Sequence, residues 1–138
     1  MTGNIDPTSA QFKKMMELED DGPIWMLNMI RFREKAAYED GREATGAEAY
    51  LTYSKESAKF FQGVGGKIAM SGGPKLVLIG PEDEHWDAIF VAEYPNAAAF
   101  GKMVKDPGYQ AIVYHRQAAV EDSRLIRIKP SDSNKLFG

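Results

Sequence analysis

Cysteine is absent from the 138-residue sequence, and histidine occurs only twice, at His85 and His115. Without cysteine the chain cannot form disulfides, use a thiolate nucleophile or bind a metal through sulfur. The two histidines stand far apart and fit no spacing typical of a metal site. No glycine-rich loop leads from a strand into a helix, as a phosphate site would require. We therefore expect neither a metal nor a cofactor.

Long apolar runs and an excess of basic residues are also missing. No stretch of about 18 apolar residues occurs, so we expect no membrane span. The start, MTGNIDPTSAQFKK, lacks the apolar segment of a signal peptide, which makes a cytoplasmic location the expectation. Acidic residues (20) outnumber basic residues (17), and the net charge is −3, so we expect neither nucleic acid nor a membrane as partner.

The residues that are present suit a single soluble domain. Hydrophobic residues make up 43% of the chain and charged residues 27%, values typical of globular proteins. We divide the chain into an N-terminal helical extension (residues 1–22), one domain (23–128) and a tail (129–138). The tail looks like a loose end or an arm that reaches a partner.

The longest apolar run, PIWMLNMIRF from Pro23 to Phe32, predicts a strand buried on both faces. Asn28 interrupts its middle, and a buried amide needs a hydrogen-bonding partner. The helix before the run is expected over residues 7–19, with Asp6 as its N-cap. The polar stretch after the run, residues 33–46, is either a rim or lid over a site or a solvated loop.

Local patterns predict the remaining elements. Thr45 and Glu48 have capping-box spacing and begin a helix that should run to about Phe61. The other expected elements are a strand over 67–79 that bends at 71–74, a tight acidic hairpin connection, a strand over 86–94, a helix from Asn96 that restarts at Asp106-Pro107, and a strand over 123–128.

After the first helix the order is strand, helix, strand, strand, helix, strand. This order predicts an α+β fold of the ferredoxin-like βαββαβ type, with a four-stranded antiparallel sheet and both helices on one face. The first and third strands are apolar on both sides, and a bare apolar sheet face would find a partner. We therefore expect a homodimer that packs sheet against sheet.

Three segments of the chain resemble the domain-of-unknown-function family numbered 1330: PIWMLNMIRFREKAAYEDGREATGAEAYLTYSKES, LIGPEDEHWDAIFVAEYPNAAAF and DPGYQAIVYHRQAAVEDSRLI. The resemblance runs from about residue 20 to residue 128. It implies a dimeric α+β barrel, in which two ferredoxin-like sheets close into one barrel. It implies no established reaction, since proteins of this fold include cofactor-independent monooxygenases, lactone isomerases, haem-dependent dismutases and structural members.

Three kinds of polar side chain stand out on otherwise apolar faces. The amide of Asn28 either orients a ligand carbonyl or oxyanion, or bonds to neighbouring backbone or a tyrosine. Tyr50 and Tyr53 either donate hydrogen bonds into a pocket or pack with their hydroxyls at its wet end. Arg116 lies on the apolar stripe of its helix and needs a partner, either a ligand carboxylate or an internal acid such as Glu93 or Asp122.

Trp86, at the start of the third strand, either caps the same pocket or anchors the core or the dimer interface. Arg31 alternates with apolar residues and suits either an interface salt bridge or a ligand. His85 belongs to an acidic run, where a solvated surface position is the simpler interpretation.

Two hypotheses follow. The first is a homodimer that binds a small organic molecule, with or without a carboxylate, in an apolar pocket lined or gated by Asn28, Tyr50, Tyr53, Trp86 and Arg116. If this protein is catalytic, cofactor-independent oxidation or isomerisation fits best. The second is a non-catalytic structural or interaction dimer whose polar core residues only define the fold. The sequence identifies no catalytic residue.

Overall fold

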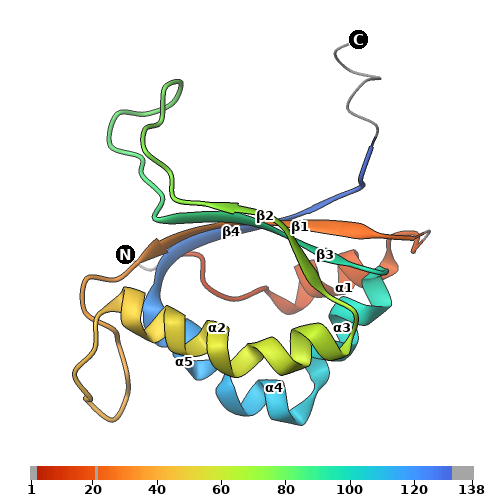
Figure 1. Ribbon diagram of the computed structural model, residues 1–138, viewed down its shortest axis with the longest axis horizontal. Coiled ribbons are helices and arrows are strands. Elements are labelled where there is room, and N and C mark those ends of the chain that lie inside the picture. Colours follow the sequence, from red (N-terminus) through yellow and green to blue (C-terminus); the bar gives the residue numbers. More distant parts are fainter. Residues whose placement is uncertain (1–2, 21, 132–138) are drawn as a thin grey trace.

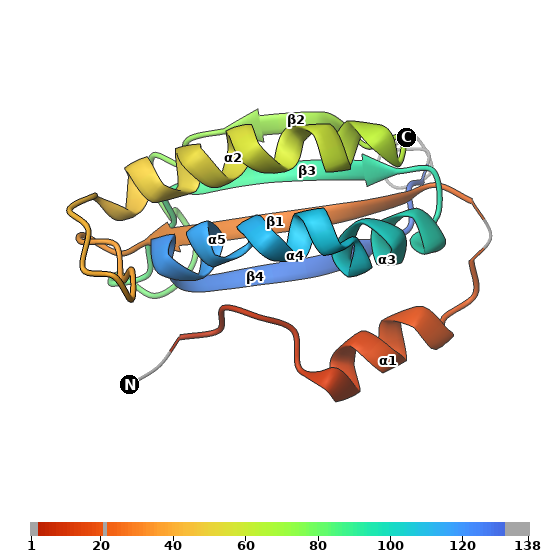
Figure 2. The same cartoon turned by 90° about the horizontal axis from the view of Figure 1, so that it is seen from below.

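The computed structural model describes residues 3–20 and 22–131, which form a four-stranded antiparallel sheet with helices against one face (Figures 1 and 2). The strand order is β2-β3-β1-β4, and this four-stranded antiparallel sheet confirms the ferredoxin-like fold predicted above. The elements are α1 (Ser9–Glu17), β1 (Ile24–Phe32), α2 (Gly46–Gly63), β2 (Lys67–Gly72), β3 (Ala88–Tyr94), α3 (Ala97–Lys105), α4 (Pro107–Ile112), α5 (Tyr114–Ala119) and β4 (Val120–Ile128).

The apolar run becomes β1, an inner strand that pairs with β3 on one side and β4 on the other. Its alternate residues Ile24, Met26 and Ile30 pack in the core and are at most 2% exposed. Pairing on both edges satisfies the strand's backbone, so its apolar side chains can be buried at little polar cost. The central position of the strand is confirmed, but Leu27 and Met29 on its other face stay partly exposed in the single chain, so only one of the two faces is buried.

Local sequence patterns also set the helix ends. The Thr45 hydroxyl accepts a hydrogen bond from the Glu48 N–H at 3.0 Å, and the Glu48 carboxylate accepts one from the Thr45 N–H at 2.9 Å, which confirms the capping box. After α2 the chain turns at Gly65, whose φ of 85° favours glycine. Asp106 caps α4 by accepting from the Gly108 N–H at 2.7 Å, so the predicted break before Pro107 is confirmed.

The prediction for residues 67–87 is wrong in its second half. β2 ends at Gly72, and the predicted strand at 75–79 is part of a long connection that rises from the sheet face opposite the helices (Figure 1). Pro74 lacks an N–H, and Gly72 already pairs with Ile89 near the start of β3, so no strand remains for the segment to pair with. The connection is therefore not the tight hairpin that the sequence suggested.

Three element boundaries also differ from prediction. Thr8, not Asp6, caps α1, since its hydroxyl accepts from the Gln11 N–H at 3.1 Å. β3 begins after Asp87, whose carboxylate turns back to accept from the Phe32 N–H at 2.8 Å. β4 begins at Val120, directly after α5, and so includes three more residues than predicted from the apolar pattern at 123–128.

Among the described residues, no helix is long and apolar enough to cross a membrane. The predicted role of the tail falls largely on residues 132–138, which lie outside the described residues.

Candidate functional site

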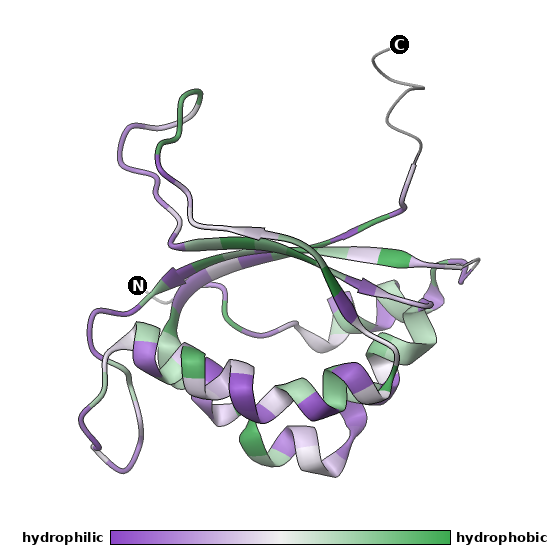
Figure 3. Cartoon of the chain, in the orientation of Figure 1, coloured by the Kyte–Doolittle hydropathy of each residue, from purple (hydrophilic) through white to green (hydrophobic). Residues whose placement is uncertain are grey.

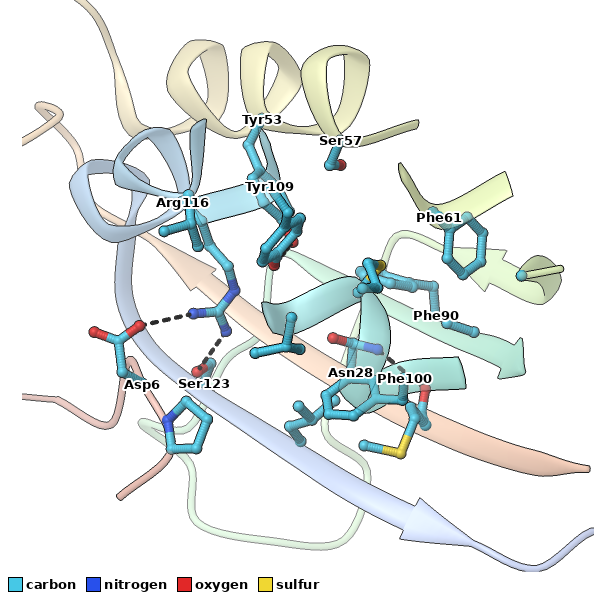
Figure 4. A pocket seen from close by; sticks show the side chains of 18 of the residues that line it. Asp6, Asn28, Tyr53, Ser57, Phe61, Phe90, Phe100, Tyr109, Arg116 and Ser123 are labelled. Atoms are coloured by element: carbon cyan, nitrogen blue, oxygen red, sulfur yellow. Dashed lines mark hydrogen bonds and ion pairs between the residues drawn. The ribbon is translucent and has the colours of Figure 1, made fainter. Parts of the chain in front are cut away.

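A cavity of about 1250 Å³ lies between the helix-facing side of the sheet and the helices (Figure 4). Side chains of β1, β3 and β4 form its floor, and α2 and the α3–α5 helices form its walls. Residues 4–8 and part of α1 line a further side. Its aromatic lining residues are Phe12, Tyr50, Tyr53, Phe61, Phe90, Tyr94, Phe100 and Tyr109. The volume is that of a pocket for an organic molecule of drug size or larger.

Asn28 lies on the floor of the cavity, next to Phe90 of the neighbouring strand β3 (Figure 4). Its Nδ2 donates to the carbonyl of Met26 at 3.0 Å. Within residues 3–20 and 22–131, no donor reaches its Oδ1. The backbone bond predicted as one alternative is therefore present, and half of the amide remains available to a ligand.

The tyrosines of the helix wall form one cluster. The Tyr53 and Tyr109 hydroxyls share a hydrogen bond of 2.6 Å, and the Tyr50 and Tyr53 ring centroids are 5.4 Å apart. Burial raises the pKa of Tyr50, Tyr53 and Tyr109 above the ordinary tyrosine value, so all three stay protonated at neutral pH. Neutral phenols can donate a hydrogen bond to a ligand oxygen but cannot act as bases there.

Tyr109 was not predicted as a site residue. A tyrosine on an apolar helical stripe is ordinarily a core residue, so its residue type did not mark it. The structure shows that Tyr109 lines the cavity, where its hydroxyl bonds to that of Tyr53 from α2. This contact depends on how α2 and α4 pack together, so the sequence of either helix alone does not predict it.

Arg116 reaches the side of the cavity that residues 4–8 line (Figure 4). One of its Nη atoms donates to the carbonyl of Ile5 and the other to the Ser123 hydroxyl at 3.4 Å. The ion-pair partner of Arg116 is Asp6, whose carboxylate oxygen lies 4.0 Å away, rather than Glu93 or Asp122. The side chain is 12% exposed. The predicted internal ion pair is present only as this long contact with Asp6, and the hydrogen bonds of Arg116 go to neutral oxygen atoms.

Trp86 is not among the residues that line this cavity. Its indole ring lies near two guanidinium groups, with Arg31 5.9 Å and Arg124 5.5 Å from the ring centroid. Arg31 in turn pairs with Glu121 at 3.1 Å and Asp122 at 3.6 Å. Trp86 therefore belongs to a cation–aromatic cluster with Arg31 of β1 and Arg124 of β4, and of these three residues only Arg124 also lines the cavity.

The histidines lie outside the cavity as well. His115 Nδ1 is 2.6 Å from the Tyr38 hydroxyl, and burial lowers the pKa of this imidazole. His85 borders a smaller surface pocket with Arg33 and Asp87. Residues 35–44 of the predicted rim or lid line neither pocket. No group of three or more potential metal ligands occurs among the described residues.

The family described as "Domain of unknown function (DUF1330)" matches residues 41–128, more than half of the chain. This chain belongs to the DUF1330 family. The crystal structure of the RPA0582 protein of unknown function from Rhodopseudomonas palustris is 54% identical to this DUF1330 chain, with a TM-score of 0.91, and covers 95% of this chain and 99% of that one. Its methylated form is 55% identical, with a TM-score of 0.94 and coverage of 96% and 98%.

More distant structures share the fold. SnoaB, a cofactor-independent oxygenase from Streptomyces nogalater, is 13% identical with a TM-score of 0.53, over 81% of this chain and 96% of that one. A dimeric protein of unknown function with a ferredoxin-like fold from Bacteroides fragilis is 11% identical with a TM-score of 0.51, over 81% and 100%. No curated protein matches. At these identities the likeness shows the fold alone.

Proposed function

We propose that this DUF1330 protein binds a small, mostly apolar organic molecule in the cavity above the sheet. The observation that supports this most is the combination of volume and lining: about 1250 Å³ walled largely by aromatic and aliphatic side chains. A few polar groups face the same space, including the free Oδ1 of Asn28 and the protonated Tyr50. Apolar walls supply affinity, and isolated polar groups orient the ligand.

A cavity-filling substitution tests this proposal. Ala58 on α2 lines the cavity, whereas Ala98 on α3 is exposed to solvent. We expect compounds from a library of small aromatic and aliphatic molecules to raise the melting temperature of the wild type and of Ala98→Trp, but not of Ala58→Trp. If no compound stabilises the wild type, or if Ala58→Trp responds equally, the cavity is not a binding site and the protein is better described as a structural dimer.

Self-association is the second part of the proposal. The sheet face opposite the helices carries apolar side chains of three strands, among them Trp25, Leu27, Met29, Ile89, Val91, Ile126 and Ile128. Next to this face, the β2–β3 connection presents Leu76, Leu78 and Ile79, which are 77%, 84% and 93% exposed (Figure 3). A second copy would bury both surfaces. The dimeric state of the Bacteroides fragilis protein with the same fold supports this proposal.

We propose cofactor-independent oxygenation or isomerisation as a second, catalytic candidate. The specific support is the fold shared with SnoaB, which is a cofactor-independent oxygenase. Among the described residues that line the cavity, Asp6 is the only carboxylate and there is no histidine, so the substrate would have to lose a proton readily. Oxygen-electrode assays with each compound that binds would test this candidate. Binding without oxygen consumption and without a change in the compound would reject it.

A further inference from the structure

Residues 3–8 run beside β4 (Figure 2), and residues 4–8 line the cavity on that side. We call residues 3–8 the N-terminal segment. It contains no helix or strand, and residues 4 and 6–8 are exposed. Polar bonds hold it to α5 and β4: Asn4 donates to Asp122 at 2.9 Å, the Ser123 hydroxyl donates to the Asn4 carbonyl at 2.7 Å, and Arg116 donates to the Ile5 carbonyl.

The charge of the cavity lining differs in sign from that of the whole chain. Four lining residues are cationic and one is anionic, whereas the chain carries a net charge of −3. Lys67 and Arg124 are paired with Glu93 and Asp122, at 3.1 and 2.9 Å. The remaining two cationic residues are Arg116 and Arg127.

Arg116 and Arg127 bind mainly neutral oxygen atoms of the N-terminal region. Arg127 donates to the Met15 carbonyl at 3.2 Å and to the Glu19 carbonyl at 2.8 Å. Arg116 donates to the Ile5 carbonyl, and its one nearby carboxylate, Asp6, is 4.0 Å away and 50% exposed. A half-exposed ion pair at this distance contributes little. The positive charge of Arg116 is therefore largely uncompensated at a site where its side chain is only 12% exposed.

We propose that the ligand is an organic acid with an apolar body, and that its carboxylate binds Arg116 in exchange for the Ile5 carbonyl. This inference rests on the proposed binding function. A guanidinium holds a carboxylate by two parallel charge-assisted hydrogen bonds, which are stronger than a bond to a neutral carbonyl. The exchange removes one of the bonds that hold the N-terminal segment, so the segment opens as the acid binds. The apolar body then packs against the aromatic walls.

Acids and their neutral amides of the same shape test the ligand class. The probes are 4-phenylbutyrate, 2-naphthoate and dodecanoate, each with its amide, titrated into the full chain by calorimetry. We expect at least one acid to bind about tenfold or more tightly than its amide, because charged hydrogen bonds are the stronger ones. Arg116→Gln should remove this preference. Arg42→Gln should keep it, since Arg42 pairs with Asp40 at 2.5 Å outside the cavity.

Three outcomes would overturn the inference. Equal binding of acids and amides by the wild type would leave a binding cavity but reject Arg116 as a carboxylate site. Loss of the preference in Arg127→Gln, with retention in Arg116→Gln, would move the acid to the other arginine. Binding of no probe, acid or amide, would reject the inference together with the proposed function.

Single cysteines report on the N-terminal segment, since the natural chain has none. Ile5→Cys places a thiol in the segment, and Met15→Cys places one in α1, where Arg127 holds the backbone. We expect the binding acid to speed thiol modification at position 5 several-fold, its amide to leave the rate unchanged, and neither compound to speed modification at position 15. An unchanged or slower rate at position 5 with the acid bound would show that the segment does not open.

Discussion

The two faces of the sheet differ in how the side chains of β1 are buried. On the helix-facing side, Met26 and Ile30 are buried by helices of the same chain, and Asn28 between them faces a cavity. On the opposite side, Leu27 and Met29 have no helix over them and remain partly exposed. Helices of the same chain cover the first face. The second face is as apolar as a protein core, but no helix of the same chain covers it.

We expect the largest effect from a substitution on the sheet face opposite the helices. Leu27→Glu places a carboxylate at the centre of that face, where burial of an unpaired charge would cost several kcal/mol. We expect the dimer to dissociate while each chain stays folded, as measured by light scattering and circular dichroism at micromolar concentration. Leu51→Glu on the exposed side of α2 is the control and should remain dimeric. A monomeric wild type would reject sheet-to-sheet packing.

A substitution on the helix-facing side should lower the free energy of unfolding without changing the oligomeric state. Ile30 is 0% exposed, and Ile30→Ala leaves a cavity that costs about 3 kcal/mol of the free energy of unfolding. Urea unfolding measures this loss. The same truncation at Leu78, which is 84% exposed, should change the stability of an isolated chain by less than about 0.5 kcal/mol. Comparable losses at both positions would mean that the connection packs within its own chain.

Asp122 links the N-terminal segment to Arg31 and Arg124 of the cation–aromatic cluster. Burial alone would raise its pKa, but hydrogen bonds from Asn4, Arg124 and the Ser123 N–H lower the pKa to about 2. A folded-state pKa below the unfolded value stabilises the fold above about pH 4, and this contribution disappears as the pH falls toward 2. We expect Asp122→Asn to cost about 2 kcal/mol at pH 7 and almost nothing near pH 2, measured by denaturation across this range. A constant difference at all pH values would contradict the assignment.

The smallest expected effect is at the start of α2, which builds the cavity wall. Thr45→Ala removes the hydroxyl that accepts from the Glu48 N–H and should cost about 1 kcal/mol. Thr45→Ser keeps the hydroxyl and is the matched control, with a melting temperature close to that of the wild type. Equal losses in the two variants would show that the methyl group, rather than the cap, matters.

Much of the fold could be predicted because the relevant interactions are local. The capping box at Thr45, the break at Asp106-Pro107 and the apolar run at 23–32 each depend on residues close in sequence. The prediction failed at 75–79, where Leu76, Leu78 and Ile79 form a pattern typical of a buried strand. The pattern shows that these residues are apolar, but it does not predict whether residues of the same chain or of a second copy bury them.

Asn28, Tyr50, Tyr53 and Arg116 were predicted from polar residues on apolar faces, and the structure brings these four to one cavity. Trp86 was grouped with them because it begins a strand, yet the pairing of that strand places it near Arg31 and Arg124. The surroundings of a residue at the end of a strand depend on where the strand pairing ends. Here the regular pairing of β3 with β1 ends at Asp87, whose carboxylate accepts the hydrogen bond of the Phe32 N–H.

The sequence by itself determined the types of the main elements, their order and the inner position of β1, because periodicity and capping act over a few residues. Only the tertiary structure decided the partner of Arg116. The carbonyl of Ile5 lies 111 positions away, and every residue has a backbone carbonyl, so no side-chain pattern could mark it. The cavity and the segment that closes it are likewise products of packing between distant parts of the chain.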